Sequence, residues 1–244
     1  MKRFILIAIL AFPILGLIFW LIFGVLMRTH SKPPPQGSIE KTVPDRLQEF
    51  GPSARARWKP FFEAKQVAYP PARLVLVGIK DEQRLEVYAA GDGGTMQFIR
   101  SYPILAASGV AGPKLREGDK QVPEGIYPVE WLNPNSKYHL SFRVGYPNEI
   151  DREQAKLEGR TNLGGDIMIH GGEKSIGCLA MGDPASEDLF VLAAETGISN
   201  ITLVLAPVDF RKGKNVAELG TLPKWTPGLY ETIKAKLNEL PVQN

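Results

Sequence analysis

A histidine and a cysteine lie close together in a stretch that reads DIMIHGGEKSIGCLAMGD from Asp166 to Asp183. An apolar strand is expected to end at His170, and a glycine-rich loop of seven residues then returns the chain to Cys178. A free thiol with a pKa of about 8.5 is mostly protonated at neutral pH, so a neighbouring imidazole is needed to accept its proton. The spacing therefore predicts Cys178 as a nucleophile and His170 as its base.

The same loop contains the expected donors for a developing oxyanion. Backbone amides next to glycine can approach a substrate closely because no side chain obstructs them. Gly177 and the amide of Cys178 are the candidates. The role of Ser175 is left open, because its hydroxyl could orient the imidazole, contact substrate or bond the local backbone, as serine in glycine-rich turns usually does.

Each of these residues also has a structural interpretation. A lone cysteine is commonly a small buried apolar residue, and a histidine at a strand end is commonly a satisfied core residue. The combination favours catalysis. The chain has one cysteine and three histidines, and His30 lies beside a predicted membrane segment. One of the two other histidines therefore lies within a single loop of the only cysteine. His139 lines the pocket, orients His170 or pairs with a backbone carbonyl. One cysteine and two domain histidines do not form a zinc-ligand pattern, so no metal site is predicted.

The run His-Gly-Gly-x-x-Ser-x-Gly-Cys-x-x-Met resembles the active-site motif of the L,D-transpeptidase catalytic domain of the YkuD type, in particular its YafK-like branch. Upstream segments such as VPEGIY, NPNS and HLSF agree with that branch, and the resemblance covers about residues 45–210. In the broader family a histidine stands two residues before the cysteine, where this chain has Ile176. The short spacing resembles the YafK-like variant, and the missing histidine leaves the reaction product open.

The resemblance implies a mostly β YkuD fold and attack on the bond after the L-centre of a diaminopimelate residue in a peptidoglycan stem, which gives a thioester. Transfer to an amine makes the enzyme a transpeptidase. Transfer to water makes it an L,D-carboxypeptidase, or an amidase that frees peptidoglycan-bound lipoprotein. No metal or organic cofactor is implied. Substrate contacts are expected from five residues of the β region: Tyr138, His139, Arg143, Tyr146 and Gly171.

Two other classes of function compete with the hypothesis of a peptidoglycan-modifying cysteine enzyme. A catalytically silent anchored module that binds cell wall would keep the fold without needing the histidine and cysteine. A general cysteine peptidase usually carries its cysteine far before its histidine, which is the reverse of the order found here. An activated Cys178 is expected to react with iodoacetamide well below pH 8, whereas a buried structural thiol would stay inert.

The N-terminal segment predicts a membrane anchor. Phe4–Met27 is 24 residues without a charge, which exceeds the roughly 20 residues that a spanning helix needs. A cleaved signal peptide would have a shorter apolar region and small residues at its end. Lys2 and Arg3 precede the helix and more than 200 residues follow it, so a signal anchor in the inner membrane with a periplasmic catalytic domain is expected. Those two bases and Arg28 account for the net charge of +3, which gives no indication of nucleic-acid binding.

The expected architecture is a mostly β sandwich or open barrel with peripheral helices, after one transmembrane helix. Short helices, broken at Gly51-Pro52 and strained at Pro60, are expected between Pro44 and Ala64. Further helices are expected at Glu149–Leu157, at Glu187–Glu195 with Asp183 as its N-cap, and at Pro227–Leu240. Strands are expected at 74–79, 84–90, 95–108, 125–132, 137–144, 166–170 and 201–205. The predicted divisions are an anchor (1–30), a proline-rich linker (31–43), the catalytic domain (44–210) and a helical extension (211–244).

Overall fold

The computed structural model describes residues 40–214 and 222–241. The predicted anchor and most of the predicted linker lie outside these residues. None of the helices within the described ranges is both long enough and apolar enough to cross a membrane.

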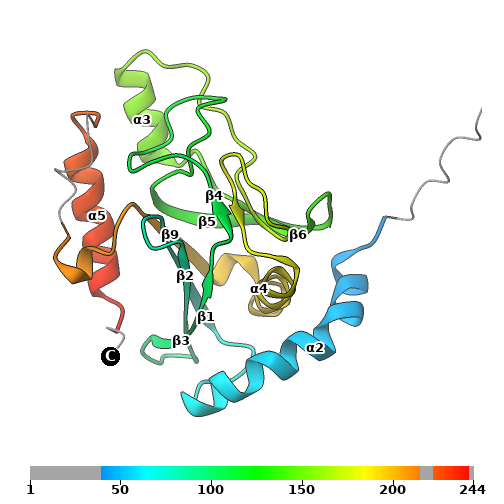
Figure 1. Ribbon diagram of the computed structural model, residues 1–244. Coiled ribbons are helices and arrows are strands. Elements are labelled where there is room, and N and C mark those ends of the chain that lie inside the picture. Colours follow the sequence, from blue (N-terminus) through cyan, green and yellow to red (C-terminus); the bar gives the residue numbers. More distant parts are fainter. Residues whose placement is uncertain (1–39, 215–221, 242–244) are drawn as a thin grey trace, which may run out of the picture. The chain divides into compact units, whose positions relative to one another are not determined.

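The centre of the fold is a curved sheet of nine strands in the order β3-β2-β1-β9-β5-β6-β7-β8-β4. Its pairs are antiparallel except for β1 with β9 and β7 with β8. Strands β3 and β4 follow each other in the chain yet lie at opposite ends of this order, so the sheet bends into a half-barrel (Figure 1). This confirms the mostly β prediction. The strands are β1 (Arg73–Ile79), β2 (Arg84–Ala90), β3 (Gln97–Pro103), β4 (Ala106–Ala107), β5 (Gly125–Ser136), β6 (His139–Val144), β7 (Met168–His170), β8 (Leu179–Ala180) and β9 (Ile201–Ala206).

The segment 95–108 was predicted as one strand, and that prediction is wrong. Strand β3 ends at Pro103, because proline has no amide hydrogen for a sheet ladder. The chain then crosses to the other sheet edge, where the amide of Leu105 donates to the carbonyl of Ala180 at 2.8 Å. Strand β4 pairs with β8 there, and this crossing brings residues after 105 next to the loop that carries Cys178.

The central strands are buried on both faces, which explains their continuous apolar runs. Along β1, Leu74 and Leu76 face one hydrophobic cluster, while Val75 and Val77 face the other. Helices α2 (Val43–Ala64) and α4 (Asp183–Thr196) cover the first face, and α5 (Thr226–Asn238) covers the second (Figure 1). The remaining helices of the described residues are α3 (Glu149–Leu157), η1 (Ile198–Asn200) and η2 (Phe210–Lys212).

Helix α2 is one continuous helix despite Pro52 and Pro60, so the predicted break is corrected. Thr42 and Asp45 form a capping box at its start. Its buried residues are Gly51, Ala54, Trp58 and Phe62, whose spacing of three or four makes one apolar stripe. Docking of this stripe on α4 and the sheet offsets the cost of the two prolines, which each remove one helical hydrogen bond.

Helix α4 begins four residues before its predicted start. Its N-cap is Gly182, and Asp183 is its first residue rather than its cap. The carboxylate of Asp183 instead accepts a hydrogen bond from the amide of Gly172 at 2.8 Å. This contact ties the start of the helix to the loop that follows His170.

The stability of the protein is expected to depend on pH through the buried residue Asp151. It is buried near the start of α3, where its carboxylate accepts the amide of Asn148 at 2.9 Å. Burial raises the pKa of Asp151 from 3.8 to about 6, against the opposing effect of that amide. Because the folded state binds a proton more tightly than the unfolded chain, the contribution of Asp151 to stability falls as pH rises from about 4 to about 6.

We therefore expect the free energy of unfolding of Asp151→Asn, measured relative to the wild type, to be roughly 1–3 kcal/mol higher at pH 8 than at pH 4. Asparagine retains an oxygen that can accept the Asn148 amide. Urea unfolding of both proteins at the two pH values measures this difference. An identical pH dependence in the two proteins would contradict the assignment.

Candidate active site

The two predicted catalytic residues flank the loop between β7 and β8, since His170 ends β7 and Cys178 is the last residue before β8. The parallel register pairs Ile169 with Leu179 and His170 with Ala180, so Cys178 immediately precedes β8 beside Met168. Side chains alternate across a strand, and Ile169 and Leu179 face the core. His170 and Cys178 therefore lie on the opposite face, as diagonal neighbours about 8 Å apart at their Cα atoms by strand geometry.

His170 is held in one tautomer. Its Nδ1 lies 2.5 Å from the carbonyl oxygen of Gly171. A carbonyl can only accept, so Nδ1 carries the hydrogen and Nε2 is left as a proton acceptor. Burial lowers the pKa of His170 below 6.5, outweighing the opposite effect of the Gly171 bond. The imidazole is thus neutral at neutral pH, as a general base must be.

The Cys178 thiol is partly buried and bonded to backbone. Its Sγ accepts the amide of Met168 at 3.4 Å and donates to the carbonyl of Asp166 at 3.6 Å. Burial raises the pKa of Cys178 above 9.0; the Met168 amide and the charge of Lys114 act against this, and the Asp166 charge adds to it. Within the described residues Sγ has no hydrogen bond to His170, so the resting pair is a thiol and a neutral imidazole.

The predicted oxyanion donors have other partners in this structure. The amide of Gly177 donates to Ser108 Oγ at 2.6 Å, and the amide of Cys178 donates to Ser175 Oγ at 2.9 Å. Ser175 Oγ in turn donates to the carbonyl of Cys178 at 2.5 Å. Ser175 thus bonds the local backbone, which is the structural alternative left open for it. Use of these amides by an oxyanion requires the two hydroxyls to give way.

Gly171 and Tyr138 border His170. The rings of Tyr138 and His170 lie 4.8 Å apart, and Tyr138 is 53% exposed at the β5–β6 turn. A Cβ on Gly171 would lie 2.8 Å from the Tyr138 carbonyl and 2.9 Å from the Cβ of His139, so only glycine fits. Both residues therefore lie beside the predicted base, and their contact with substrate stays a prediction.

The other three expected substrate contacts have different surroundings. His139 Nε2 lies 3.0 Å from Glu187 on α4, and its ring packs on Phe50 of α2, so it docks helices rather than orienting His170. Arg143 pairs in register with Met168, on the face that carries Cys178, and forms ion pairs with Glu130 and Asp166.

Tyr146 was predicted to contact substrate, and its burial corrects that prediction. It is 1% exposed in the core, and its hydroxyl lies 3.2 Å from the carbonyl oxygens of both Lys114 and Leu163. Its ring consequently supports the loops around the site and presents no surface to a ligand. The face of a short strand that a tyrosine occupies is set by register, which sequence alone left open.

Four residues near the thiol or His170 were not predicted. Ser108 accepts the amide of Gly177, Met168 donates its amide to Sγ, and the charge of Lys114 acts to lower the pKa of the thiol. Ser141 lies directly opposite His170 in the β6–β7 register, and its buried hydroxyl has no partner among the described residues. None of the four belongs to the histidine–cysteine motif, and only their position in the folded sheet identifies them.

Metal binding was not predicted for this chain. Across residues 40–214 and 222–241, no group of three or more histidine, cysteine, aspartate or glutamate side chains is arranged to hold a metal ion. That the chemistry needs no metal or organic cofactor stays a prediction.

Comparison with known proteins defines the class of this site. The family model of the L,D-transpeptidase catalytic domain, YkuD, matches residues 72–209, which is more than half of the chain. The chain therefore belongs to the L,D-transpeptidase catalytic-domain family, as its motif predicted.

Among curated proteins, this chain is similar to the putative L,D-transpeptidase YafK of Escherichia coli strain K12. The two are 39% identical over 113 residues, which are 46% of this chain and 43% of that protein. The protein of the same name from Escherichia coli O157:H7 matches to the same extent. This chain thus spans less than half the length of the curated relatives that it matches.

Solved structures show more distant similarity. The helical cell shape determining protein Pgp2 from Campylobacter jejuni is 23% identical with a TM-score of 0.46, over 56% of this chain and 48% of that one. Bd1075 from Bdellovibrio bacteriovorus is 20% identical with a TM-score of 0.40, over 68% and 54%. L,D-transpeptidase 1 from Mycobacterium tuberculosis is 15% identical with a TM-score of 0.31, over 55% and 62%.

Proposed function

We propose that this chain is a peptidoglycan-modifying cysteine enzyme that forms a thioester on Cys178 at the diaminopimelate residue of a stem peptide. One observation carries the proposal. The β7–β8 register puts Cys178 and His170 on one face, and the Gly171 carbonyl leaves Nε2 of His170 free to accept a proton. Family membership supports the choice of substrate class.

The proposed reaction proceeds in two halves. Nε2 of His170 accepts the proton of the thiol as Sγ attacks the stem carbonyl, and the tetrahedral oxyanion collapses to a thioester. The departing amine takes the proton from His170. An incoming amine or water then gives its proton to His170 and attacks the thioester, which expels the thiolate. The Met168 amide, which donates to Sγ, favours that thiolate.

The acceptor distinguishes three products. An amine of another stem gives a cross-linked or exchanged peptide, whereas water gives a shortened stem or frees a peptidoglycan-linked lipoprotein. The apolar run Phe4–Met27 supports the further proposal of an inner-membrane anchor with the catalytic domain in the periplasm, where this substrate lies.

Mass spectrometry of reaction products tests the proposal. The full chain and its Cys178→Ala variant are incubated with tetrapeptide muropeptides and with sacculi that carry bound lipoprotein. We expect new products from the wild type and none from the variant. Cross-linked or exchanged stems establish a transpeptidase, and shortened stems or freed lipoprotein establish a hydrolase. Unchanged substrates with both folded proteins would instead favour a silent binding module.

A further inference from the structure

Arg143 was expected to contact substrate, and its ion pair with Asp166 indicates which part of the substrate it meets. The carbonyl of Asp166 accepts the Cys178 thiol at 3.6 Å. The side chain of Asp166 is 85% exposed, and its carboxylate lies 3.2 Å from Nη1 of Arg143. An exposed anion and a cation therefore lie side by side next to the predicted nucleophile, and the mechanism above uses neither of them.

The sheet register places Arg143 on the same face as the thiol. Arg143 pairs with Met168 in the β6–β7 ladder. The amide of Val144 donates to the carbonyl of Ile167, so hydrogen-bonded pairs alternate around them, and Arg143 with Met168 is a non-hydrogen-bonded pair. The Cα atoms of such a pair are only about 4.5 Å apart. Met168 in turn donates its amide to Sγ at 3.4 Å, so one residue separates the arginine from the thiol.

Arg143 has hydrogen-bond donors to spare. It forms ion pairs with Glu130 at 3.1 Å and with Asp166, yet it donates no hydrogen bond of good geometry to a described residue. Its Nη2 lies close to Gly165, where an added Cβ would be 3.2 Å away. Glycine thus leaves room for the guanidinium. A guanidinium with open donors is a planar receptor for a carboxylate.

Asp166 carries two local costs. Its φ is 54°, in the left-handed region, which glycine would adopt without strain. Burial raises the pKa of Cys178, and the charge of Asp166 adds to that effect. The carboxylate therefore opposes formation of the thiolate until a cation neutralises it. A ligand ammonium beside Asp166 would supply that cation when substrate is bound.

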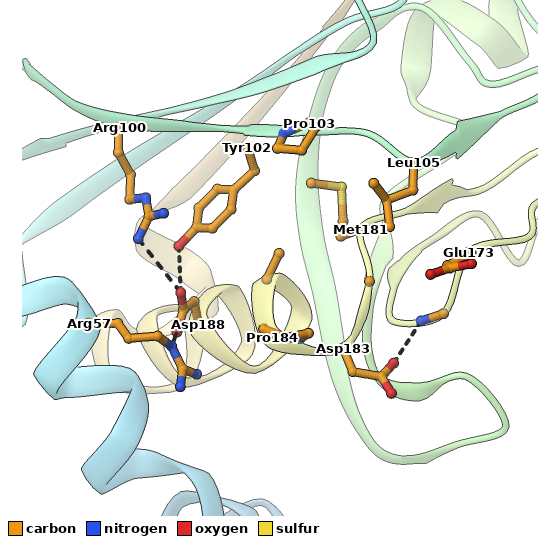
Figure 2. A pocket seen from close by; sticks show the side chains of 13 residues that line it. Arg57, Arg100, Tyr102, Pro103, Leu105, Glu173, Met181, Asp183, Pro184 and Asp188 are labelled. Carbon is orange, nitrogen blue, oxygen red and sulfur yellow. Dashed lines mark hydrogen bonds and ion pairs between the residues drawn. The ribbon is translucent and has the colours of Figure 1, made fainter.

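A nearby groove lies on the opposite face of the sheet. It has a volume of about 670 Å³ and is bounded by the β3–β4 segment, the start of α4 and the loop after His170 (Figure 2). Met181 lines this groove and belongs to the hydrophobic core. Because side chains alternate along an extended chain, Met181 and Cys178 point to opposite faces. A stem that reacts at the thiol therefore meets the Arg143–Asp166 pair and not this groove.

We propose that Arg143 and Asp166 form a receptor for the free amino acid centre at the far end of the donor diaminopimelate side chain. Arg143 binds the carboxylate of that centre and Asp166 binds its ammonium. The proposal rests on the proposed function, because diaminopimelate is the ligand. A short alkyl chain separates this centre from the reacting L-centre, and the Asp166 carboxylate is likewise one side chain away from the carbonyl that contacts Sγ.

Single-turnover acylation of Cys178 tests the receptor. The full chain, in excess, is mixed with a tetrapeptide stem whose far centre is free, amidated at its carboxylate or acetylated at its amine. Quenched-flow mass spectrometry then measures the thioester. We expect amidation to slow acylation by about 10- to 100-fold, through the loss of charge-assisted bonds. Acetylation should slow it by about 2- to 5-fold, because the ion pair of an exposed carboxylate is weak.

Two variants separate the two contacts. In Arg143→Gln the free and amidated stems should react at similar rates, while the free amine is still preferred to the acetylated one. In Asp166→Asn the preference for the free amine should be lost and that for the free carboxylate retained. Arg152→Gln, which changes an exposed arginine on α3, is the matched control and should keep both preferences. A ratio of rates within one protein is unaffected by a partly unfolded fraction, so a destabilised variant remains informative.

The outcomes separate this receptor from the enzymatic function. Equal acylation rates for all stems, or a carboxylate preference that persists in Arg143→Gln, would overturn the receptor alone. Preferences confined to the later transfer step would also overturn it, because they would belong to the acceptor stem. Binding of the same stems to the Cys178→Ala chain is measured in parallel. An Arg143-dependent binding preference without any acylation would support the receptor and refute the enzymatic function, and the absence of both would refute the two together.

Discussion

His170→Asn is expected to lower the rate at which a stem peptide acylates Cys178 by at least about 100-fold at pH 7. Asparagine can still donate to the Gly171 carbonyl, which replaces Nδ1, but it has no proton acceptor in the place of Nε2. The wild-type rate should fall with acid only below pH 6.5, since burial lowers the pKa of His170 below that value. Stopped-flow acylation followed by mass spectrometry measures both effects.

Alkaline pH distinguishes a lost base from a lost structure. Burial raises the pKa of Cys178 above 9.0, so the variant should regain rate only above that pH, where the thiolate forms without a base. Iodoacetamide labelling of the His170→Asn variant should rise over the same range. His139→Asn is the matched control, because His139 bonds Glu187 and should affect stability more than rate. A flat, inactive profile of His170→Asn across pH 6–10 would refute the base assignment.

The placement of His170 and Cys178 next to each other on neighbouring strands could be predicted from sequence, because a short glycine-rich loop joins β7 to β8. The details of the site could not. Ser108, which accepts the Gly177 amide, is 69 residues away in sequence and follows a strand of only two residues. The raised pKa of the thiol results from burial by the folded sheet, which a linear motif does not contain.

The fold divides in a similar way. Apolar runs predicted most strands because the central sheet is buried on both faces, and local patterns suffice for such strands. The division of 95–108 between two sheet edges depends on where β8 lies, and that is a long-range contact. Helix α2 persists through Pro52 and Pro60 because Trp58 and its neighbours pack on α4, and tertiary packing outweighs local propensity.

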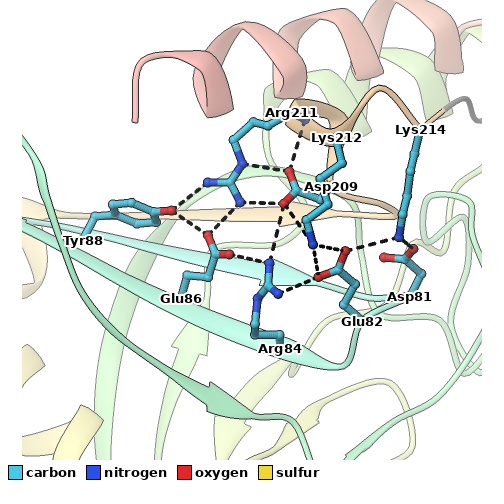
Figure 3. Close-up of polar contacts among 9 residues, drawn as sticks. All are labelled: Asp81, Glu82, Arg84, Glu86, Tyr88, Asp209, Arg211, Lys212 and Lys214. Carbon is cyan, nitrogen blue, oxygen red and sulfur yellow. Dashed lines mark hydrogen bonds and ion pairs between the residues drawn. The ribbon is translucent and has the colours of Figure 1, made fainter. Parts of the chain in front are cut away.

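The other large effect is expected far from the catalytic loop, in a buried charge network (Figure 3). The guanidinium of Arg211 donates to Glu86 at 2.8 Å, to Asp209 at 2.7 and 3.0 Å, and to the Tyr88 hydroxyl at 2.7 Å. Glu86 is fully buried and Asp209 is 2% exposed. Arg84 also contacts both carboxylates, at 2.7 Å and 3.5 Å. Two buried anions therefore depend on two arginines.

Arg211→Met is expected to lower the free energy of unfolding by about 3–5 kcal/mol, because one of these anions is left without a compensating charge. Guanidinium chloride unfolding followed by tryptophan fluorescence measures the change. Lys214→Met removes exposed ion pairs to Asp81 and Glu82 at the edge of the same network and should cost no more than about 1 kcal/mol. Equal losses from the two substitutions would mean that burial does not set the energetics of this cluster. A buried ion pair that is replaced as a unit is commonly tolerated. If the double variant Arg211→Met, Glu86→Leu recovers part of the lost stability, the uncompensated carboxylate of Glu86 is therefore the cause of the loss.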